Sequence, residues 1–263
     1  MTIRTVFTGL LTSLALIQSA SAIGAAIPQQ IRFGTDPTFP PFEYKTPQGE
    51  LAGFDIDLGN ALCSELKVKC VWVENSFDGL IPALQAKKFD AILSSLSITA
   101  ERQKAIAFSD KLFNTPAYLV IGKNSGLKPT IESLKGKRLG VQQGSVFEAY
   151  ANKHWRNAGV EIVTYPDAES VYADLTLGRL DATLDDATVV TAALLNKPQG
   201  KNFMLAEPQV KDPAIFGPGT GIGLRKADTQ LQARLNSAIA AIRANGTYDQ
   251  LAKKYFNFNV YGE

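Results

Sequence analysis

Apolar and polar positions along the chain switch repeatedly between two periods. Short runs typical of buried strands alternate with longer runs whose apolar positions follow the helical period. The first half reads IRFGT, FDIDLGNALCSEL, CVWVE, FDGLIPALQAKK and DAILSSL. The alternation resumes with AYLVIGK, TIESLKG, RLGVQQ, SVFEAYANKHWRNAG, EIVTYP, ESVYADLTLGR, DATLDD, ATVVTAALLN and FMLAEP, and ends with IGLRK and two helices separated at Gly246. This pattern predicts an α/β fold.

Two segments far apart in the chain share one pattern, which we call the echo. Residues 83–95, ALQAKKFDAILSS, and residues 174–186, DLTLGRLDATLDD, carry a leucine, a basic residue, an Asp-Ala pair and a second leucine in the same register. A helix-turn-strand unit can also arise by chance in any α/β chain, so this alternative stays open. If the echo reflects structure, the chain contains two similar lobes.

The stretch ILSSLSITAERQ begins as a buried strand and ends as a helix with Arg102 in its first turn. The first turn of a helix has partial positive charge and unpaired N–H groups, so an arginine there is mildly disfavoured and an anion is favoured. Arg102 can donate two parallel hydrogen bonds to a carboxylate. Ser94, Ser95, Ser97 and the helix start offer further donors. The alternative is a solvated surface arginine.

The ends of the predicted strands place candidate carboxylates opposite these donors. In open α/β sheets, ligands lie beyond the carboxyl ends of the strands. The two echoed strands end at Ser94-Ser95 and at Asp185-Asp186. Asp186 is therefore a candidate partner for an ammonium group, although an aspartate after a strand is often only a turn or cap residue. Two lobes that face each other would thus suit a zwitterion.

A third carboxylate, Asp36, lies in FGTDPTFPPF after the first strand and close to Phe39 and Phe42. An Asx turn before the proline is one interpretation. The other is a carboxylate at the edge of a cleft, beside aromatic faces that cover an aliphatic chain or attract a cation.

The first 22 residues, MTIRTVFTGLLTSLALIQSASA, have the charge, the apolar run and the small-residue ending of a secretory signal peptide. The apolar run is too short to cross a membrane, and we expect a chain without transmembrane insertion. The net charge of +2 for 263 residues includes Arg4, so the mature chain is nearly neutral. This balance offers no electrostatic surface for nucleic acid.

The two cysteines, Cys63 and Cys70, lie in ALCSELKVKC. In an oxidising compartment this spacing indicates one local disulfide, and two reduced thiols are the alternative. The spacing differs from the C-x-x-C of redox enzymes and zinc sites.

Several enzyme classes are disfavoured. The sole histidine is His154, in the helical stretch YANKHWRNAG, so a Ser-His-Asp triad depends on that residue and a multi-histidine metal site is impossible. The segment GPGTGIG lacks the lysine of a P-loop and the strand-to-helix context of a dinucleotide fingerprint. We expect no cofactor and no metal.

From about Ile31 to Glu263 the chain resembles the periplasmic binding proteins of polar amino acid ABC transporters, and within them the lysine/arginine/ornithine- and histidine-binding branch. The resemblance rests on segments that occur in order and at matching spacing: GFDIDLGNALC, FDGLIPALQAKKFDAILSSLSIT, RQKAIAFSDKL, SLKGKRLGV, EAYAN, GRLDA, GTGIGLRK and NGTYDQLAKKYFNFNVYG.

The resemblance implies the type II periplasmic binding protein fold, with two lobes joined by a two-stranded hinge. A signal peptide would cover residues 1–22. Lobe 1 would combine residues 23–113 with 217–263, and lobe 2 would span residues 116–210. The amino acid would lie in the cleft between the lobes.

The resemblance also implies roles for individual residues. Arg102 would bind the α-carboxylate with Ser95 and the backbone near Ser97, and Asp186 would bind the α-ammonium. Asp36 would meet the distal cation of the ligand. Further pocket residues would be Phe39 and Phe77, which sandwich the aliphatic stem, and Ser94, while Cys63 and Cys70 match the short disulfide of the family.

Departures from the family pattern fall where specificity is set. Phe39 replaces a tyrosine, so a hydroxyl is missing. In lobe 2 Gln142, Val146 and Phe147 replace leucine, threonine and glutamine, whereas Ser145 is retained. Val146 removes a donor toward the carboxylate, and Gln142 adds a polar group that can contact a longer side chain.

The sequence therefore predicts a monomeric, exported, non-enzymatic periplasmic receptor that binds a cationic amino acid and delivers it to an ABC permease in the membrane. Histidine is a further candidate ligand, and an opine or another arginine derivative is an alternative. Two different functions also stay open: an enzyme similar to cyclohexadienyl dehydratase on the same scaffold, and a receptor that feeds a chemoreceptor.

Overall fold

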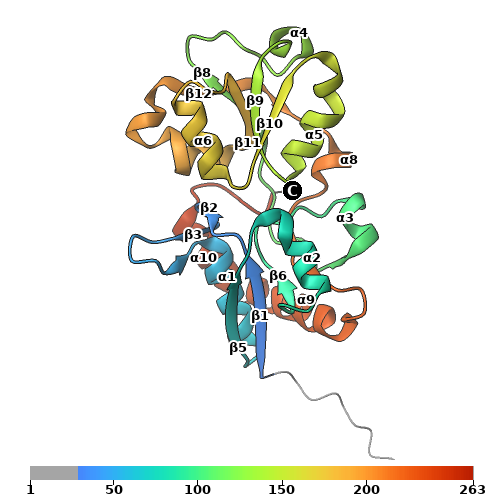
Figure 1. Cartoon of the computed structure of the whole chain (residues 1–263). Helices are drawn as coiled ribbons and strands as arrows, with labels where there is room; N and C mark the ends of the chain where they lie inside the picture. The colour runs from blue at the N-terminus through green and yellow to red at the C-terminus, as the bar shows by residue number, and fades with distance from the viewer. Residues whose placement is uncertain (1–28, 263) are drawn as a thin grey trace, which may run out of the picture.

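The computed structural model of the chain describes residues 29–262. The predicted signal peptide, residues 1–22, lies outside the described residues. The chain forms two lobes, one above the other in Figure 1, and each is built on its own five-stranded sheet. A cavity lined by residues of both lobes lies between them. The predicted α/β class and the two-lobe architecture are confirmed.

The sheet of lobe 1 is mixed and takes strands from both ends of the chain. Its spatial order is β5 (Lys69–Glu74), β1 (Gln30–Thr35), β6 (Ala91–Ile92), β13 (Gly223–Leu224) and β7 (Ala107–Phe108). β5, β1 and β6 are parallel, whereas β13 runs antiparallel to both of its neighbours. A small antiparallel sheet belongs to the same lobe and is made of β2 (Thr38–Phe39), β3 (Glu43–Lys45) and β4 (Leu51–Ala52).

Five helices belong to lobe 1: α1 (Phe54–Glu65), α2 (Leu80–Gln85), α3 (Ala100–Ala105), α9 (Thr229–Ala244) and α10 (Thr247–Tyr255). A 3₁₀ turn, Phe77–Gly79, precedes α2. Buried aromatic rings join the early and late parts of the chain, because Phe42 stacks on Phe113 with ring centroids 4.6 Å apart and also contacts Phe256. The C-terminal helices are thus part of the same core as β1 and α1.

The sheet of lobe 2 comes from one continuous segment. Its order is β10 (Glu161–Tyr165), β9 (Arg138–Gln142), β11 (Ala182–Asp186), β8 (Ala117–Gly122) and β12 (Phe203–Val210). The helices around it are α4 (Ile131–Leu134), α5 (Val146–His154), α6 (Ala168–Thr176) and α7 (Ala187–Val190), and α8 (Pro213–Phe216) follows β12. Two short 3₁₀ segments, Arg156–Ala158 and Pro198–Asn202, and one π-helical segment, Thr191–Leu195, complete the lobe.

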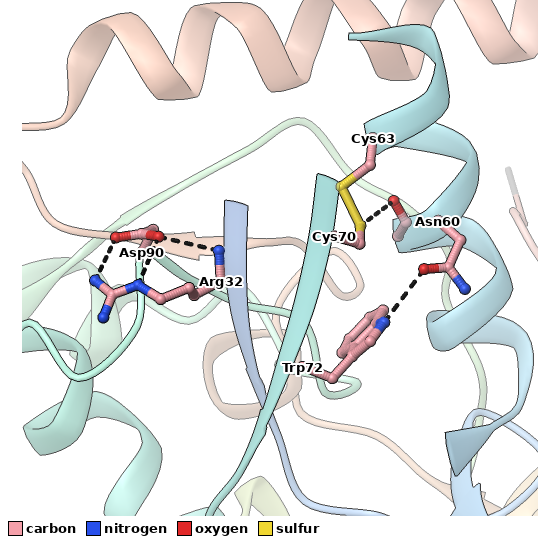
Figure 2. The surroundings of a disulfide bond; sticks show 7 residues. Arg32, Asn60, Cys63, Cys70, Trp72 and Asp90 are labelled. Atoms are coloured by element: carbon pink, nitrogen blue, oxygen red, sulfur yellow. Dashed lines mark hydrogen bonds and ion pairs between the residues drawn. A yellow bond between two sulfur atoms is a disulfide. The ribbon is translucent and has the colours of Figure 1, made fainter. Parts of the chain in front are cut away.

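The echo between residues 83–95 and 174–186 marks the same unit in each lobe. The backbone N–H of Arg32 donates to Asp90 Oδ2 at 3.0 Å, and the backbone N–H of Arg138 donates to Asp181 Oδ2 at 2.8 Å. Figure 2 shows the first of these contacts, in which the Arg32 guanidinium also bonds the Asp90 carboxylate. Each echoed aspartate ties the start of its strand to the neighbouring parallel strand, so the echo is confirmed.

The echo extends to the residue before each aspartate. Phe89 packs over Gly34 of β1, and Leu180 packs over Gly140 of β9. A Cβ atom on either glycine would lie only 2.4 Å from the covering side chain, so neither position has room for a larger residue.

Two segments connect the lobes and lie side by side. Leu112 and Phe113 exchange backbone hydrogen bonds with Thr220, and Ala117 at the start of β8 pairs with Val210 at the end of β12. These two crossings form the two-stranded hinge that the family resemblance implies. Below, lobe 2 means residues 116–210, the boundaries that the sequence predicts.

The predicted disulfide is present. Cys63 near the end of α1 and Cys70 at the start of β5 are bonded, with Cα atoms 5.7 Å apart (Figure 2). Trp72, two residues further along β5, donates its indole N–H to Asn60 of the same helix at 3.2 Å. The bond therefore closes a short loop at the edge of lobe 1, away from the cleft.

Within residues 29–262 no helix is long and apolar enough to cross a membrane.

Candidate functional site

A cavity of about 320 Å³ lies between the two lobes. Ten of the eleven predicted binding residues line it: Asp36, Phe39, Phe77, Ser95, Ser97, Arg102, Gln142, Ser145, Val146 and Asp186. The topology brings them together, since strands of both sheets end at the cleft and present the loops that follow them. The geometry gives each a distinct environment.

Arg102 lies in the first turn of α3, and Thr99 caps this helix by accepting a hydrogen bond from the Arg102 backbone N–H at 3.1 Å. Its guanidinium donates to the backbone carbonyl of Ser97 at 3.0 Å and, across the cleft, to that of Gly144 at 3.0 Å. It also lies 5.5 Å from the ring centre of Phe77. Burial lowers the pKa of Arg102 to about 10, so the group stays protonated at neutral pH.

No carboxylate of the described residues pairs with Arg102; its hydrogen-bond partners are backbone carbonyls. A charged guanidinium that is partly removed from water and lacks a counter-ion favours an incoming anion. The planar fork suits a carboxylate, as the sequence predicts.

Ser94 is the exception among the predicted pocket residues. It is fully buried and does not line the cavity. Its hydroxyl accepts from the Asp36 backbone N–H at 2.9 Å and donates to Glu43 Oε1 at 3.1 Å. In place of the expected direct contact with a ligand, Ser94 forms hydrogen bonds to Asp36 and Glu43 behind the cavity wall.

Ser95 lines the cavity but turns its hydroxyl toward lobe 1. The hydroxyl donates to Glu43 Oε2 at 3.0 Å, and the backbone N–H donates to Asp55 Oδ2 at 2.7 Å. Ser95 has a left-handed backbone conformation, φ 48°, which aims its N–H into the protein. Ser97 lines the cavity beside it and pairs with Thr220 of the hinge.

Glu43 is a wall residue that the sequence did not predict. It lines the cavity, is 1% exposed, and accepts the hydroxyls of both Ser94 and Ser95. The segment PPFEYK has no pattern that marks a buried acid. The burial of Glu43 follows from the packing of β3 against the residues after β6, Ser94 and Ser95.

Asp186 ends β11 and caps α7. Its Oδ1 accepts the backbone N–H groups of Thr188 at 2.7 Å and Val189 at 3.1 Å, and its Oδ2 accepts the hydroxyl of Thr115 from the hinge. Burial raises the pKa of Asp186, and these donors oppose the rise. Asp186 also lines the cavity. The residue that caps α7 is thus the same residue that the sequence predicts as the partner of the ammonium group.

The neighbouring Asp185 points the other way. Its Oδ2 accepts the hydroxyl of Tyr172 at 2.6 Å inside lobe 2. Burial raises the pKa of Asp185 to about 7, and Asp185 is absent from the cavity wall.

Asp36 lines the cavity together with Phe39. Its Oδ1 accepts the hydroxyl of Thr38 at 3.1 Å, and its Oδ2 accepts the side-chain N–H of Gln142 at 2.9 Å. The second bond joins the two lobes. Burial raises the pKa of Asp36 to about 6. No cation of the described residues pairs with this carboxylate, which fits the predicted meeting with a ligand's distal charge.

The lobe 2 wall begins where β9 runs into α5. Ser145 caps α5, accepting the Glu148 N–H at 3.0 Å and donating to the Gln142 carbonyl at 2.7 Å. Its hydroxyl is thus already used, and the N-terminus of α5 faces the cavity with Val146. Phe147, a predicted departure from the family, also lines the cavity and lies near Phe216.

The arrangement offers one cation for an anion and carboxylates for two cations. His154, the sole histidine, pairs with Asp212 at 2.8 Å and does not line the cavity. The described residues contain no group of three or more His, Cys, Asp or Glu side chains arranged to hold a metal ion. The site therefore has the charges of an amino acid receptor.

A bilobed α/β chain with a charge-lined cleft at the hinge has the architecture of a solute-binding protein. Residues 31–258 match the bacterial extracellular solute-binding proteins, family 3, and the chain belongs to this family.

Relatives match this chain over nearly their whole length. The histidine-binding periplasmic protein of Escherichia coli is 54% identical over 256 residues, 96% of this chain and 98% of the relative. The lysine/arginine/ornithine-binding periplasmic protein of the same organism is 52% identical over 253 residues, 96% of this chain and 97% of the relative. The solved structure of an ancestral arginine-binding protein bound to arginine has a TM-score of 0.81 and 35% identity, and covers 87% of this chain and 99% of that one.

Proposed function

We propose that the protein is a periplasmic receptor that binds a cationic amino acid in its cleft and delivers it to an ABC permease in the membrane. Lysine, arginine and ornithine are the ligand class, and histidine is a further candidate. The receptor is a monomer, it performs no chemistry on the ligand, and it needs no cofactor.

One observation carries the proposal. One cavity of about 320 Å³ is lined by Arg102, Asp186 and Asp36, and Arg102 bonds only backbone carbonyls of the described residues. Each charge of a cationic amino acid therefore has an opposite charge in the wall. A buried charge is costly unless it is paired. A neutral amino acid would leave Asp36 without a cation, which favours ligands with a distal positive charge.

The mechanism follows from the way the wall is divided. Arg102 and Asp36 belong to lobe 1, whereas Asp186, Gln142 and the start of α5 belong to lobe 2. A ligand meets all of them together only when the cleft is closed, so it binds the closed form more tightly and shifts the population toward it. The closed form presents a distinct surface, and this is what the permease recognises.

The proposed roles of the residues follow the geometry. Arg102 takes the α-carboxylate together with the backbone near Ser97 and the N-terminus of α5. Asp186 takes the α-ammonium group, and Asp36 takes the distal cation. The rings of Phe39 and Phe77 cover the aliphatic stem. Ser94 acts behind the wall, where it holds Asp36 and Glu43.

A thermal-shift screen of ligand-stripped protein tests the function, followed by calorimetry on every hit. The panel contains lysine, arginine, ornithine, histidine, glutamine, octopine, nopaline and prephenate. A ligand at about a hundred times its dissociation constant stabilises the folded state by roughly 2.7 kcal/mol. Stabilisation by the basic amino acids supports the proposal. A response only to opines, or turnover of prephenate, contradicts it and identifies an opine receptor or a dehydratase instead.

Two variants test the site within the same screen. Arg102→Ala and Asp186→Ala remove one zwitterion partner each, so both should lose amino acid binding and still give a cooperative thermal transition. Near-normal affinity in either variant contradicts the assignment of that residue. Growth of a deletion strain on the ligand as sole nitrogen source separates transport from chemosensing.

A further inference from the structure

The cavity wall next to Asp36 contains two further buried acids. Glu43 of β3 lines the cavity and is 1% exposed, and Asp55 in the first turn of α1 is fully buried directly behind it. Ser95 connects the two, since its hydroxyl donates to Glu43 Oε2 at 3.0 Å and its backbone N–H donates to Asp55 Oδ2 at 2.7 Å.

The hydroxyl oxygen of Ser95 lies 3.0 Å from Glu43 Oε2 and 3.4 Å from Asp55 Oδ2, so the two carboxyls are close neighbours that share one hydroxyl proton. Oδ1 of Asp55 is buried and accepts from no N–H or hydroxyl of residues 29–262. Two ionised carboxylates only repel, whereas a protonated one donates to the other. One proton on the Glu43–Asp55 pair in the ligand-free protein would remove this repulsion.

The charged surroundings keep that proton in place. Asp36 faces Glu43 from the end of β1, and Tyr248 of α10 is the titratable neighbour of Asp55. Arg102 and Asp186 line the same cavity, but neither forms an ion pair with the acids. Burial raises the pKa of Glu43 well above its usual range and that of Asp55 to about 7. A cation that enters beside Asp36 stabilises the ionised form of Glu43 and so lowers the pKa of this carboxyl.

Resting on the function proposed above, we propose that Glu43 is a second specificity residue for the distal cation of the ligand. When the cation enters, Glu43 loses its proton to solvent, and the carboxylate that forms pairs with the cation together with Asp36. No covalent bond or electron is involved; the binding step releases one proton per cationic ligand. A neutral amino acid does not displace it.

Calorimetry of the wild-type protein in buffers of different ionisation enthalpy measures the released protons at pH 7. Lysine and arginine should release a large fraction of one proton, and glutamine should release close to none. Asp36 contributes little at this pH because its pKa of about 6 leaves it mostly ionised already. Equal release with lysine and glutamine, or none with either, overturns the inference.

The isosteric Glu43→Gln variant removes the proton donor and retains side-chain size. We expect proton release on lysine binding to fall toward zero, and lysine affinity to fall about tenfold or more with a much smaller change for glutamine. Glu65→Gln, an exposed change on α1, is the matched control and should behave as wild type. Unchanged proton release in Glu43→Gln shows that another group is the source.

A second variant keeps the inference testable if Glu43→Gln does not fold. Asp55→Asn removes the like charge behind Glu43, so the pKa of Glu43 should fall and proton release at pH 7 should decrease. Measurements on the wild-type protein separate a wrong proposed function from a wrong role for Glu43. A wild-type protein that binds no cationic amino acid contradicts the function, whereas tight binding without proton release contradicts only the role of Glu43.

Discussion

Three acidic side chains at the cleft, Asp36, Glu43 and Asp186, differ in how their oxygens are satisfied. Asp186 accepts two backbone N–H groups and a hydroxyl, and is thereby fixed in place. Asp36 and Glu43 accept hydroxyl and amide donors that a stronger donor can replace. A ligand ammonium or guanidinium forms charge-assisted hydrogen bonds, which are roughly twice as strong as neutral ones. Specificity should therefore depend on Asp36 and Glu43 more than on Asp186.

The first prediction concerns Asp36. Asp36→Asn keeps the side-chain shape and removes the charge, so we expect affinity for lysine and arginine to fall roughly 10- to 100-fold, the range of a charged hydrogen bond. Affinity for a neutral amino acid such as glutamine should change by less than about threefold. Titration calorimetry measures both, with the exposed Asp249→Asn as control. Equal losses for the two ligand classes would show that Asp36 does not meet the distal cation.

The second prediction concerns Asp185 and pH. Burial raises its pKa to about 7 in the folded protein, above the usual value of 3.8. Between these values the unfolded chain has lost the proton and the folded chain keeps it, so the free energy of unfolding decreases as pH rises. Above about pH 7 this contribution is constant.

Asp185→Asn should flatten part of this pH dependence. The wild-type protein should lose roughly 1–3 kcal/mol of stability between about pH 4.5 and about pH 8, and the variant less, because the amide does not ionise and still accepts from Tyr172. Denaturant unfolding at several pH values measures this, with the exposed Asp110→Asn as control. Identical slopes in wild type and Asp185→Asn would refute the assignment.

At the scale of elements, short helices position the charged groups by their caps. Thr99 fixes the start of α3 and with it the backbone of Arg102, Ser145 does the same for α5, and Asp186 for α7. These helices have four to nine residues. Helices of this length have little stability of their own and depend on such contacts. A cap at the cleft therefore affects binding as well as stability.

The third prediction separates these two effects. Thr99→Ala should lower the free energy of unfolding by about 1 kcal/mol, the usual value of an N-cap, and should weaken amino acid binding several-fold because Arg102 loses its fixed position. Thr130→Ala removes the equivalent cap of α4, remote from the cleft. It should cost a similar or smaller amount of stability and leave affinity unchanged. Chemical unfolding and calorimetry on both variants provide the comparison; equal affinities would contradict the role of Thr99.

The sequence predicted elements better than contacts. The alternation of periods located the strands, and the echo identified the two units in which Asp90 and Asp181 make matching bonds. Ten of the eleven predicted binding residues line the cavity. The sequence could not show that Ser94 turns inward or that Glu43 is buried, because both depend on how β3 packs against the end of β6. Contacts between residues 51 positions apart leave no local pattern.

At the scale of the whole molecule, the lobes are joined by side chains as well as by the hinge. Gln142 donates to Asp36, and Arg102 donates to the Gly144 carbonyl, so two hydrogen bonds cross the cleft between groups that a ligand would contact. Both bonds stabilise closure in the absence of ligand. Gln142, which makes the first of them, is one of the positions where the sequence analysis expects a departure from the family pattern.

The fourth prediction tests this ligand-independent closure. Gln142→Leu removes the bond to Asp36, so the ligand-free protein should open further and its radius of gyration should increase. Small-angle X-ray scattering with and without ligand should show a larger compaction on binding in Gln142→Leu than in wild type. Gln143→Leu, at the exposed neighbouring position, is the control. The same compaction in all three proteins would show that Gln142 does not stabilise closure.

The order of strands in lobe 1 also bears on how the chain folds as it emerges from a translocation channel. β13, residues 223–224, lies between β6 and β7, and β7 pairs with no other strand of its sheet. The sheet of lobe 2 is complete at Val210, whereas the sheet of lobe 1 lacks the strand between β6 and β7 until Gly223 and Leu224 have emerged. We therefore expect vectorial folding to finish the inserted lobe first. A chain halted before Gly223 would expose the edge of β6 to any protein that captures unpaired strands.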